Sequence, residues 1–428
     1  MRQSTVRLST TRARLGRASA VVAGLVAMAV AMSGCTASTA ASASQSEVPI
    51  PSAELADDTV AQLQDAVDHA MQASGSTGAL VAVWIPWAGA WVEGVGTTGP
   101  DSDEAVTTDM HFRIGEVTRA LTCSALYAVA DEGTVALDDP VTDWVSSVPN
   151  LGDVTLQQLC DGTSGLGDGR ERLAPQLHST PERTWSPREL ASPGIAERTA
   201  PGSQVVDSDA AYILLGMALE KATGLSASGV IAEYVTEPLD LAGTQLPRAA
   251  AAEPGDPALP GWVSWSADRE NGCVAPTDYT VASSSSGYTD SGATSTITDL
   301  ARFGQALALD AVDDDGALTG RWAKALPFEG ADYAGGAFIA GSMIGQKGEA
   351  LGYLTSVYAD TETGMTVAVV LNNSAAGASL VSALAKELAA IASKAPAADG
   401  QEQPEFGLPW TAEEYRAVVA ERAVCPIG

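Results

Sequence analysis

The strand-like runs of this chain lie near its two ends and are separated by about half of its length. Two runs, "TGALVAVWIP" and "GAWVEGVGTT", follow each other at 77–98 and predict a hairpin that turns over Trp87–Gly89. Three more runs lie in the last third: "GGAFIAGSMIGQ", "LGYLTSVYAD" and "GMTVAVVLNNS". The simplest closure is one antiparallel sheet built from both ends of the chain.

Most of the remaining sequence has apolar residues at helical spacing. This spacing predicts a helix near the start of this region (53–74), one from Glu116 to Gly133, a short one at 155–160, and others at 210–224, 298–309, 379–393 and 411–423. Residues 170–205, rich in Pro, Arg and Ser, predict loops. The fold class expected is mixed α/β (α+β): an antiparallel sheet flanked by terminal helices, plus a helical subdomain. A cleft between sheet and subdomain would be the default place for a site.

The charge balance of the 428 residues limits the partners. The chain has 53 acidic and 23 basic residues, with a formal net charge of −30. A surface this acidic repels phosphate backbones, so we expect no nucleic-acid partner. Lysine is scarce, with only Lys221, Lys324, Lys347, Lys386 and Lys394.

The N-terminus is typical of an export signal. An arginine-bearing stretch leads into an apolar run that is short for a membrane span and ends in "MSGC". That ending resembles the lipobox of bacterial lipoproteins and implies cleavage after residue 34 and lipid attachment to Cys35. The alternative is an ordinary secretory signal with a chance cysteine. Residues 35–55, rich in Ser and Ala, predict a tether. We therefore expect an exported protein, lipid-anchored at the outer face of the cytoplasmic membrane, in the cell envelope.

Four cysteines remain beyond Cys35. An even number outside the cytoplasm indicates two disulfides, for which three connectivities exist. We favour Cys123–Cys160 and Cys273–Cys425, because the first two lie on predicted adjacent helices. Buried free thiols are the alternative. The cysteine spacing fits no metal site, and we expect no metal and no cofactor.

Several segments between residues 56 and 393 resemble the serine β-lactamase and penicillin-recognising serine hydrolase superfamily, especially class C β-lactamases and D-Ala-D-Ala carboxypeptidases. These segments are "FRIG" at 112–115, "DEGTVALDDPV", "TLQQLCDGTSGL", "YILLGMALEKATG", "EPLDLAGT" and "TITDLARF". The resemblance implies a β-lactamase/transpeptidase-like domain over 56–393. Residues 394–428 are then a Pro-rich link and a short C-terminal helix.

The nucleophile motif of that superfamily is absent. Its members carry Ser-x-x-Lys after the "FRIG" segment, where the lysine one helical turn on accepts or holds the serine proton. Glu116 and Arg119 occupy these positions, and a guanidinium cannot act as a base near neutral pH. None of the five lysines has a serine three residues before it. Helical spacing would let Glu116 and Arg119 pair with each other and fill the nucleophile position.

The other two motifs have also changed. The family's Tyr-x-Asn corresponds to Asp207-Ser208-Asp209, which lacks the asparagine amide. Its His/Lys-Thr-Gly corresponds to Gln346, Lys347 and Gly348. The cation is displaced by one residue, which on a strand turns it to the opposite face.

With all three motifs changed, we expect no catalytic residues and a catalytically inactive binding or regulatory module of the cell envelope. Its partners would be the membrane, through the lipid anchor, and peptidoglycan fragments or an envelope protein. One alternative is an active hydrolase acting on cell-wall peptides, esters or related substrates, with Glu116 as nucleophile or base and Asp207 or Asp209 as its partner. Another is a cation site formed by these three carboxylates.

Overall fold

The computed structural model describes residues 50–146, 148, 151–248, 250–313, 318–405 and 407–427. The predicted signal (1–34), Cys35 and most of the tether lie outside these residues. All described residues belong to one compact unit, residues 45–428. No helix among them is long and apolar enough to cross a bilayer.

An eight-stranded sheet built from both ends of the chain forms the centre of this unit, as predicted. The hairpin strands β1 (Gly78–Ile85) and β2 (Gly89–Gly96) pair antiparallel, and β1 also pairs with the last strand, β14 (Thr366–Leu371). The order is β2-β1-β14-β13-β12-β11-β10-β9. The remaining strands are β13 (Tyr353–Asp360), β12 (Met343–Ala350), β11 (Ala337–Ala340), β10 (Ala331–Ala334) and β9 (Leu326–Phe328).

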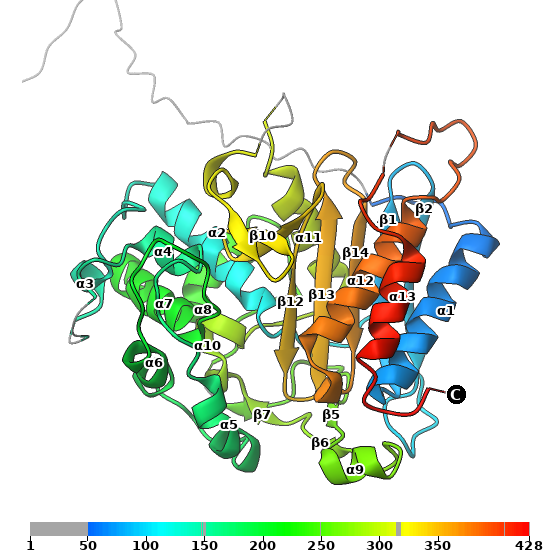
Figure 1. Cartoon of the computed structure of the whole chain (residues 1–428), viewed down its shortest axis with the longest axis horizontal. Helices are drawn as coiled ribbons and strands as arrows, with labels where there is room; N and C mark the ends of the chain where they lie inside the picture. The colour runs from blue at the N-terminus through cyan, green and yellow to red at the C-terminus, as the bar shows by residue number, and fades with distance from the viewer. Residues whose placement is uncertain are drawn as a thin grey trace, which may run out of the picture. The chain divides into compact units, whose positions relative to one another are not determined.

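The sheet separates two hydrophobic cores, because alternate side chains of a strand point to opposite faces. In β14, Val367 and Val369 belong to one core, whereas Ala368 and Val370 belong to the other. Helices α1 (Asp57–Ser74) and α12 (Ala378–Ala392) pack in the first core, and α13 (Ala412–Glu421) lies against α12 (Figure 1).

The second core joins the sheet to the helical subdomain. Helix α11 (Ile297–Leu309) packs on this face of the sheet, and α2 (Val117–Asp131) lies beside β11 and β12. The other helices of this part gather beyond α2 in Figure 1. They include α3 (Val141–Trp144), α4 (Leu156–Cys160), α5 (Arg170–Ser179), α6 (Pro187–Ala196), α7 (Asp209–Thr223), α8 (Ala227–Ile231) and α10 (Tyr288–Ser291). Helix α9 (Ser266–Glu270) precedes strand β6 (Thr277–Asp278).

Two local predictions were wrong. The run "GGAFIAGSMIGQ" is not one strand: it turns at Gly341, with φ +59°, and its second part continues as β12. Residues 170–205 are not all loop, because they contain α5 and α6. Ser186 caps the start of α6, where its hydroxyl accepts a hydrogen bond from the Glu189 amide, and proline follows at the first helical position. Proline there is compatible with a helix, so the composition was misleading.

The four cysteines beyond Cys35 form two disulfides, Cys123–Cys160 and Cys273–Cys425, the connectivity favoured from the sequence. The first joins α2 to α4. The second joins the loop after α9 to the segment that follows α13, at the other end of the chain.

Candidate functional site

The candidate site lies where the start of α2 meets β12. Gly115, with φ +54°, and Gly348 make this close approach possible. A Cβ on Gly115 would lie 2.4 Å from the Glu349 nitrogen, and one on Gly348 would lie 2.6 Å from the Glu116 nitrogen. Both glycines therefore have a steric reason to be there. They bring the positions corresponding to the first and third family motifs into direct contact.

Glu116 is the residue before α2, and its carboxylate is engaged at both oxygens. Oε1 lies 3.1 Å from Nη2 of Arg170, and Oε2 accepts a hydrogen bond of 2.6 Å from the Glu349 amide. Burial raises the pKa of Glu116, and the cation of Arg170 opposes this shift. The backbone N–H of Glu349 is thus not free to polarise a substrate carbonyl in this conformation.

Arg119 does not pair with Glu116, contrary to the prediction from helical spacing. Its Nη1 lies 2.6 Å from Asp207 Oδ1, and its Nε lies 2.8 Å from Asp290 Oδ1. The guanidinium also lies over the Tyr212 ring, 4.8 Å from the ring centroid. Burial lowers the pKa of Arg119, but the two carboxylates raise it by more, to well above its ordinary value. The side chain is therefore a permanent cation.

Asp290 holds the site together and was missed by sequence reasoning. It lies on α10, its side chain is 1% exposed, and its second oxygen is 2.8 Å from Nη2 of Arg170. Arg170 also donates to the Ser291 hydroxyl at 2.8 Å. No family motif quoted above includes Asp290 or Arg170, and Arg170 stands in a segment predicted as loop. We call Glu116, Arg119, Arg170, Asp207 and Asp290 the charge network.

The two aspartates at the positions of Tyr-x-Asn have separate environments. The Asp207 side chain is 54% exposed, and Arg119 lowers its pKa. Asp209 begins α7, and its Oδ1 accepts hydrogen bonds from the Gly169 and Ala210 amides. Burial, and then the nearby Asp290 charge, raise the pKa of Asp209 to about 6. Each carboxylate binds its own donors, so the arrangement does not resemble a general acid–base pair.

Gln346 and Lys347, at the positions of the third motif, are also bound to other groups of the protein. Gln346 is buried, and its amide donates to the Gly336 carbonyl at 2.7 Å and to the Tyr333 hydroxyl at 3.3 Å. Lys347 forms an ion pair of 2.5 Å with Glu329, in the turn between β9 and β10. The cation is therefore held outside the charge network.

The two hydroxyls closest in sequence to the motif positions have structural roles. Thr118 Oγ1 donates to the Gly115 carbonyl at 2.7 Å and accepts from the Ala293 amide at 3.1 Å. Ser208 caps α7, accepting from the Ala211 amide, and donates to the Gly167 carbonyl at 3.0 Å.

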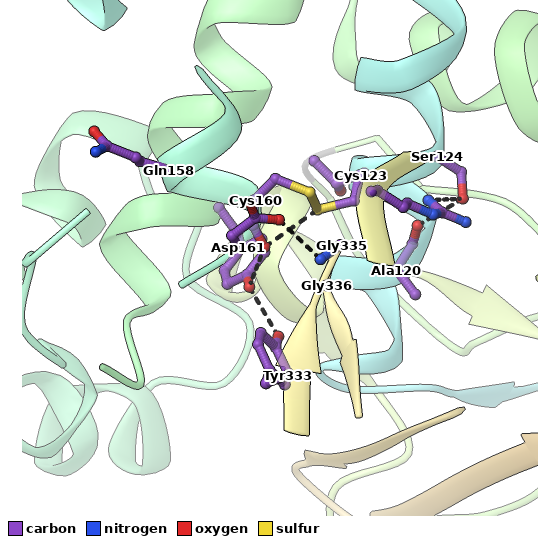
Figure 2. The surroundings of a disulfide bond; sticks show 12 residues. Ala120, Cys123, Ser124, Gln158, Cys160, Asp161, Tyr333, Gly335 and Gly336 are labelled. Atoms are coloured by element: carbon purple, nitrogen blue, oxygen red, sulfur yellow. Dashed lines mark hydrogen bonds between the residues drawn. A yellow bond between two sulfur atoms is a disulfide. The ribbon is translucent and has the colours of Figure 1, made fainter. Parts of the chain in front are cut away.

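The Cys123–Cys160 disulfide, shown in Figure 2, joins α2 to α4. Cys123 stands four residues after Arg119 on α2. The Tyr212 hydroxyl donates to the Cys160 carbonyl at 2.9 Å and lies 2.8 Å from the Tyr333 hydroxyl. Asp161, the residue after Cys160, accepts a hydrogen bond of 3.0 Å from the Gly335 amide. This cross-linked layer restrains α2 relative to α4 and β10.

The structure brings together part of the carboxylate trio considered for a cation. Glu116 and Asp207 both belong to the charge network, but two arginines lie between them. Across the described part of the chain, no group of three or more His, Cys, Asp or Glu residues could hold a metal ion.

The fold resembles solved hydrolase and penicillin-binding structures. A D-stereospecific amidohydrolase from Streptomyces sp. superposes with a TM-score of 0.61 at 22% identity, covering 73% of this chain and 94% of the other. The octameric penicillin-binding protein homologue from Pyrococcus abyssi gives a TM-score of 0.62 at 20% identity, covering 78% and 77%.

Sequence relatives include the D-alanyl-D-alanine-carboxypeptidase/endopeptidase AmpH of Escherichia coli strain K12, 31% identical over 204 residues, 46% of this chain and 51% of the relative. Esterase EstB of Burkholderia gladioli is 28% identical over 220 residues, 47% and 54% of the two chains. The chain thus spans about half the length of these curated relatives. The β-lactamase family model matches residues 63–390. With this match over most of its length, the chain belongs to the β-lactamase family.

Proposed function

We propose that this chain is a catalytically inactive member of the β-lactamase family that acts as a binding or regulatory module of the cell envelope. The observation that carries the proposal is the position of Arg119, buried between Asp207 and Asp290 where the family places its lysine base. A guanidinium held by two carboxylates cannot accept a proton near neutral pH. Loss of a nucleophile or its base removes several powers of ten in rate.

The carboxylate of Glu116 supports the same proposal. One of its oxygens accepts a hydrogen bond from the Glu349 amide, and the other forms an ion pair with Arg170. A substrate carbonyl would have to displace this anion before it could reach either donor. The first step of acyl transfer is therefore hindered by the protein's own side chain.

A hydrolase that uses Glu116 finds less support in the geometry. Such an enzyme needs a second carboxyl group to exchange protons with the substrate or water. Asp207 is ion-paired with Arg119, and Asp209 accepts two backbone hydrogen bonds. Neither is presented as a free partner to Glu116.

Covalent labelling tests the absence of acyl transfer. The full chain is incubated with a fluorescent penicillin and run on a denaturing gel, beside an active D-Ala-D-Ala carboxypeptidase. We expect no labelled band from this chain. A band abolished by Thr118→Ala or Ser208→Ala would overturn the proposal, because it would identify an active hydroxyl.

Turnover assays test the carboxylate alternative. Because relatives are named as a carboxypeptidase/endopeptidase and an esterase, the substrates are a D-Ala-D-Ala peptide and p-nitrophenyl acetate. We expect rates equal to those of buffer with an inert protein of similar size. Hydrolysis that Glu116→Gln abolishes, while Glu402→Gln leaves it unchanged, would establish an enzyme.

The binding role and the anchor have separate tests. We propose that peptidoglycan fragments or an envelope protein bind this chain, which the lipid at Cys35 would hold at the outer face of the membrane. Muropeptides should raise the melting temperature in a thermal-shift assay, without being cleaved.

Mass spectrometry of the exported protein should find a diacylglyceryl-modified Cys35, and Cys35→Ala should release the protein from the membrane fraction.

A further inference from the structure

A pocket of about 540 Å³ lies between the strands β9, β10 and β11 and the helix α12, and no residue of the charge network lines it. One wall is formed by the ends of β9, β10 and β11, with Asp332 and Ile339. The opposite wall is formed by Lys386 on α12 together with Pro409, Trp410 and Tyr415. The last three residues lie beyond the region that matches the family model, which ends at residue 390. Part of one wall of the pocket therefore comes from the C-terminal segment that follows the matched region.

The ammonium group of Lys386, which lines this pocket, lies near three aromatic rings. Its Nζ lies 5.2 Å from the ring centroid of Tyr415, 5.8 Å from that of Trp410 and 5.9 Å from that of Tyr358. The indole N–H of Trp410 donates to the Lys386 carbonyl at 3.0 Å, which fixes the ring against α12. These contacts orient the ammonium group, because cation–π attraction favours positions over a ring face.

This ammonium has no carboxylate partner. No Asp or Glu of the described chain lies within 4.0 Å of Lys386 Nζ, although the sequence has 53 acidic residues. The nearby Glu329 is taken by Lys347 at 2.5 Å. Burial lowers the pKa of Lys386, and the charge of Lys347 lowers it further. Partly buried cations are normally paired, so an unpaired one facing a pocket indicates room for an anion.

We propose that this pocket binds an organic monocarboxylate with an apolar body, whose carboxylate pairs with Lys386. The Trp410 indole, Pro409 and Ile339 offer apolar surface beside the cation. The volume lies within the range of small-molecule sites, roughly 300–1,000 Å³. The exposed Asp332 lines the same pocket and disfavours a polyanion such as a phosphate ester.

This inference is independent of the proposed function. It uses no residue of the charge network, and it holds whether or not the chain hydrolyses anything. Its failure would leave the argument from Arg119 and Glu116 unchanged.

Two small probes of the same shape test the proposal on the purified full chain. 3-Phenylpropionate carries the carboxylate, and 3-phenylpropan-1-ol replaces it by a neutral hydroxyl. Binding is followed by NMR at the Trp410 indole N–H, assigned with Trp410→Phe. We expect a saturable shift with the acid at a Kd on the order of 1–10 mM, as suits a ligand of this size, and binding at least about tenfold weaker for the alcohol.

Variants of Lys386 and of a nearby lysine identify the cation that binds the carboxylate. Lys386→Met keeps most of the side-chain volume and should weaken acid binding at least about tenfold, whereas Lys386→Arg keeps the charge and should retain it. Lys394→Met, at an exposed position just after α12, is the matched control and should bind like the original chain. Equal affinity for acid and alcohol, undiminished binding by Lys386→Met, or no saturable shift would overturn the proposal. Should Lys386→Met not fold, the comparison of acid and alcohol still decides.

Discussion

Asp290 Oδ1 lies 2.8 Å from Nε of Arg119, and the Asp290 side chain is only 1% exposed. Its other oxygen binds Arg170, so one buried carboxylate joins two cations from different helices. Arg170 in turn reaches Glu116. The residues at the nucleophile and base positions are therefore joined indirectly, through Asp290 and Arg170.

Removing the Asp290 charge should strongly destabilise the protein. Asp290→Asn keeps the shape but leaves two arginines facing each other without the shared anion. Arg119 keeps Asp207 and Arg170 keeps Glu116, but both lose their most buried partner. Breaking a buried ion pair on one side costs roughly 3–5 kcal/mol. The free energy of unfolding, measured by urea denaturation, should fall by about that amount.

Asp207→Asn is the matched control for this prediction. It removes a carboxylate from the same arginine, but the Asp207 side chain is 54% exposed, so water screens the pair. The loss should be about 0–1 kcal/mol. Equal losses from the two variants would mean that Asp290 is not the central anion of the network.

Shortening Glu116 should create a site for a small carboxylate. Glu116→Ala frees the Glu349 amide and one face of Arg170, two donors that now bind the side-chain carboxylate. Acetate should refill the position and stabilise the variant by about 1.4 kcal/mol at a concentration of roughly ten times its Kd. Thermal unfolding with and without acetate measures this.

The original chain is the control, at equal ionic strength with chloride replacing acetate. Its melting temperature should not respond to acetate, because Glu116 already occupies the donors. A similar response from both proteins would show that the Glu116 carboxylate does not block this position.

The sheet and most helices could be predicted because their signals are local. The apolar run at 77–86 and the runs after residue 335 correspond to buried strands, and the second run of the hairpin corresponds to a partly buried one. Strands β9 and β10 were not predicted, because they are short and contain Pro327 and Asp332, which weaken a strand pattern.

The partners within the site could not be predicted from spacing. Residues three apart on a helix can pair, which led to the wrong expectation for Glu116 and Arg119. The structure offers Arg119 a better partner in Asp290, 171 residues further along the chain. Such long-range pairing depends on how α10 packs against α2, which no local pattern encodes.

Loss of the Cys273–Cys425 disulfide should release the C-terminal helix. The bond closes a separation of 152 residues, and replacing both cysteines by serine should cost roughly 3–5 kcal/mol. Hydrogen exchange of residues 411–424 should become faster than in the original chain. The Cys123→Ser/Cys160→Ser variant is the comparison: if it loosened α13 equally, the effect would not be specific to the terminal bond.

Glu387 should make stability depend on pH. This α12 residue has a side chain only 2% exposed. Its Oε1 lies 3.4 Å from Nη1 of Arg416, and its Oε2 has no hydrogen-bond partner in the described part of the chain. Burial raises the pKa of Glu387 to about 7, although Arg416 opposes the shift. An unfolded glutamate titrates near pH ~4.3.

Because the folded pKa is the higher one, the folded chain binds more protons between these two values. The stabilising contribution of the protonated carboxyl is full below pH ~4.3 and is lost as the pH rises through about 7. Glu387→Gln has no proton to lose, and Asp65 still pairs with Arg416 at 2.8 Å in this variant. Its free energy of unfolding should match that of the original chain at pH ~4 and exceed it by on the order of 2–4 kcal/mol at pH ~8. Glu402→Gln, at an exposed position, should follow the original chain at both values. A constant difference between Glu387→Gln and the original chain across this range would show that folding does not change the pKa of Glu387.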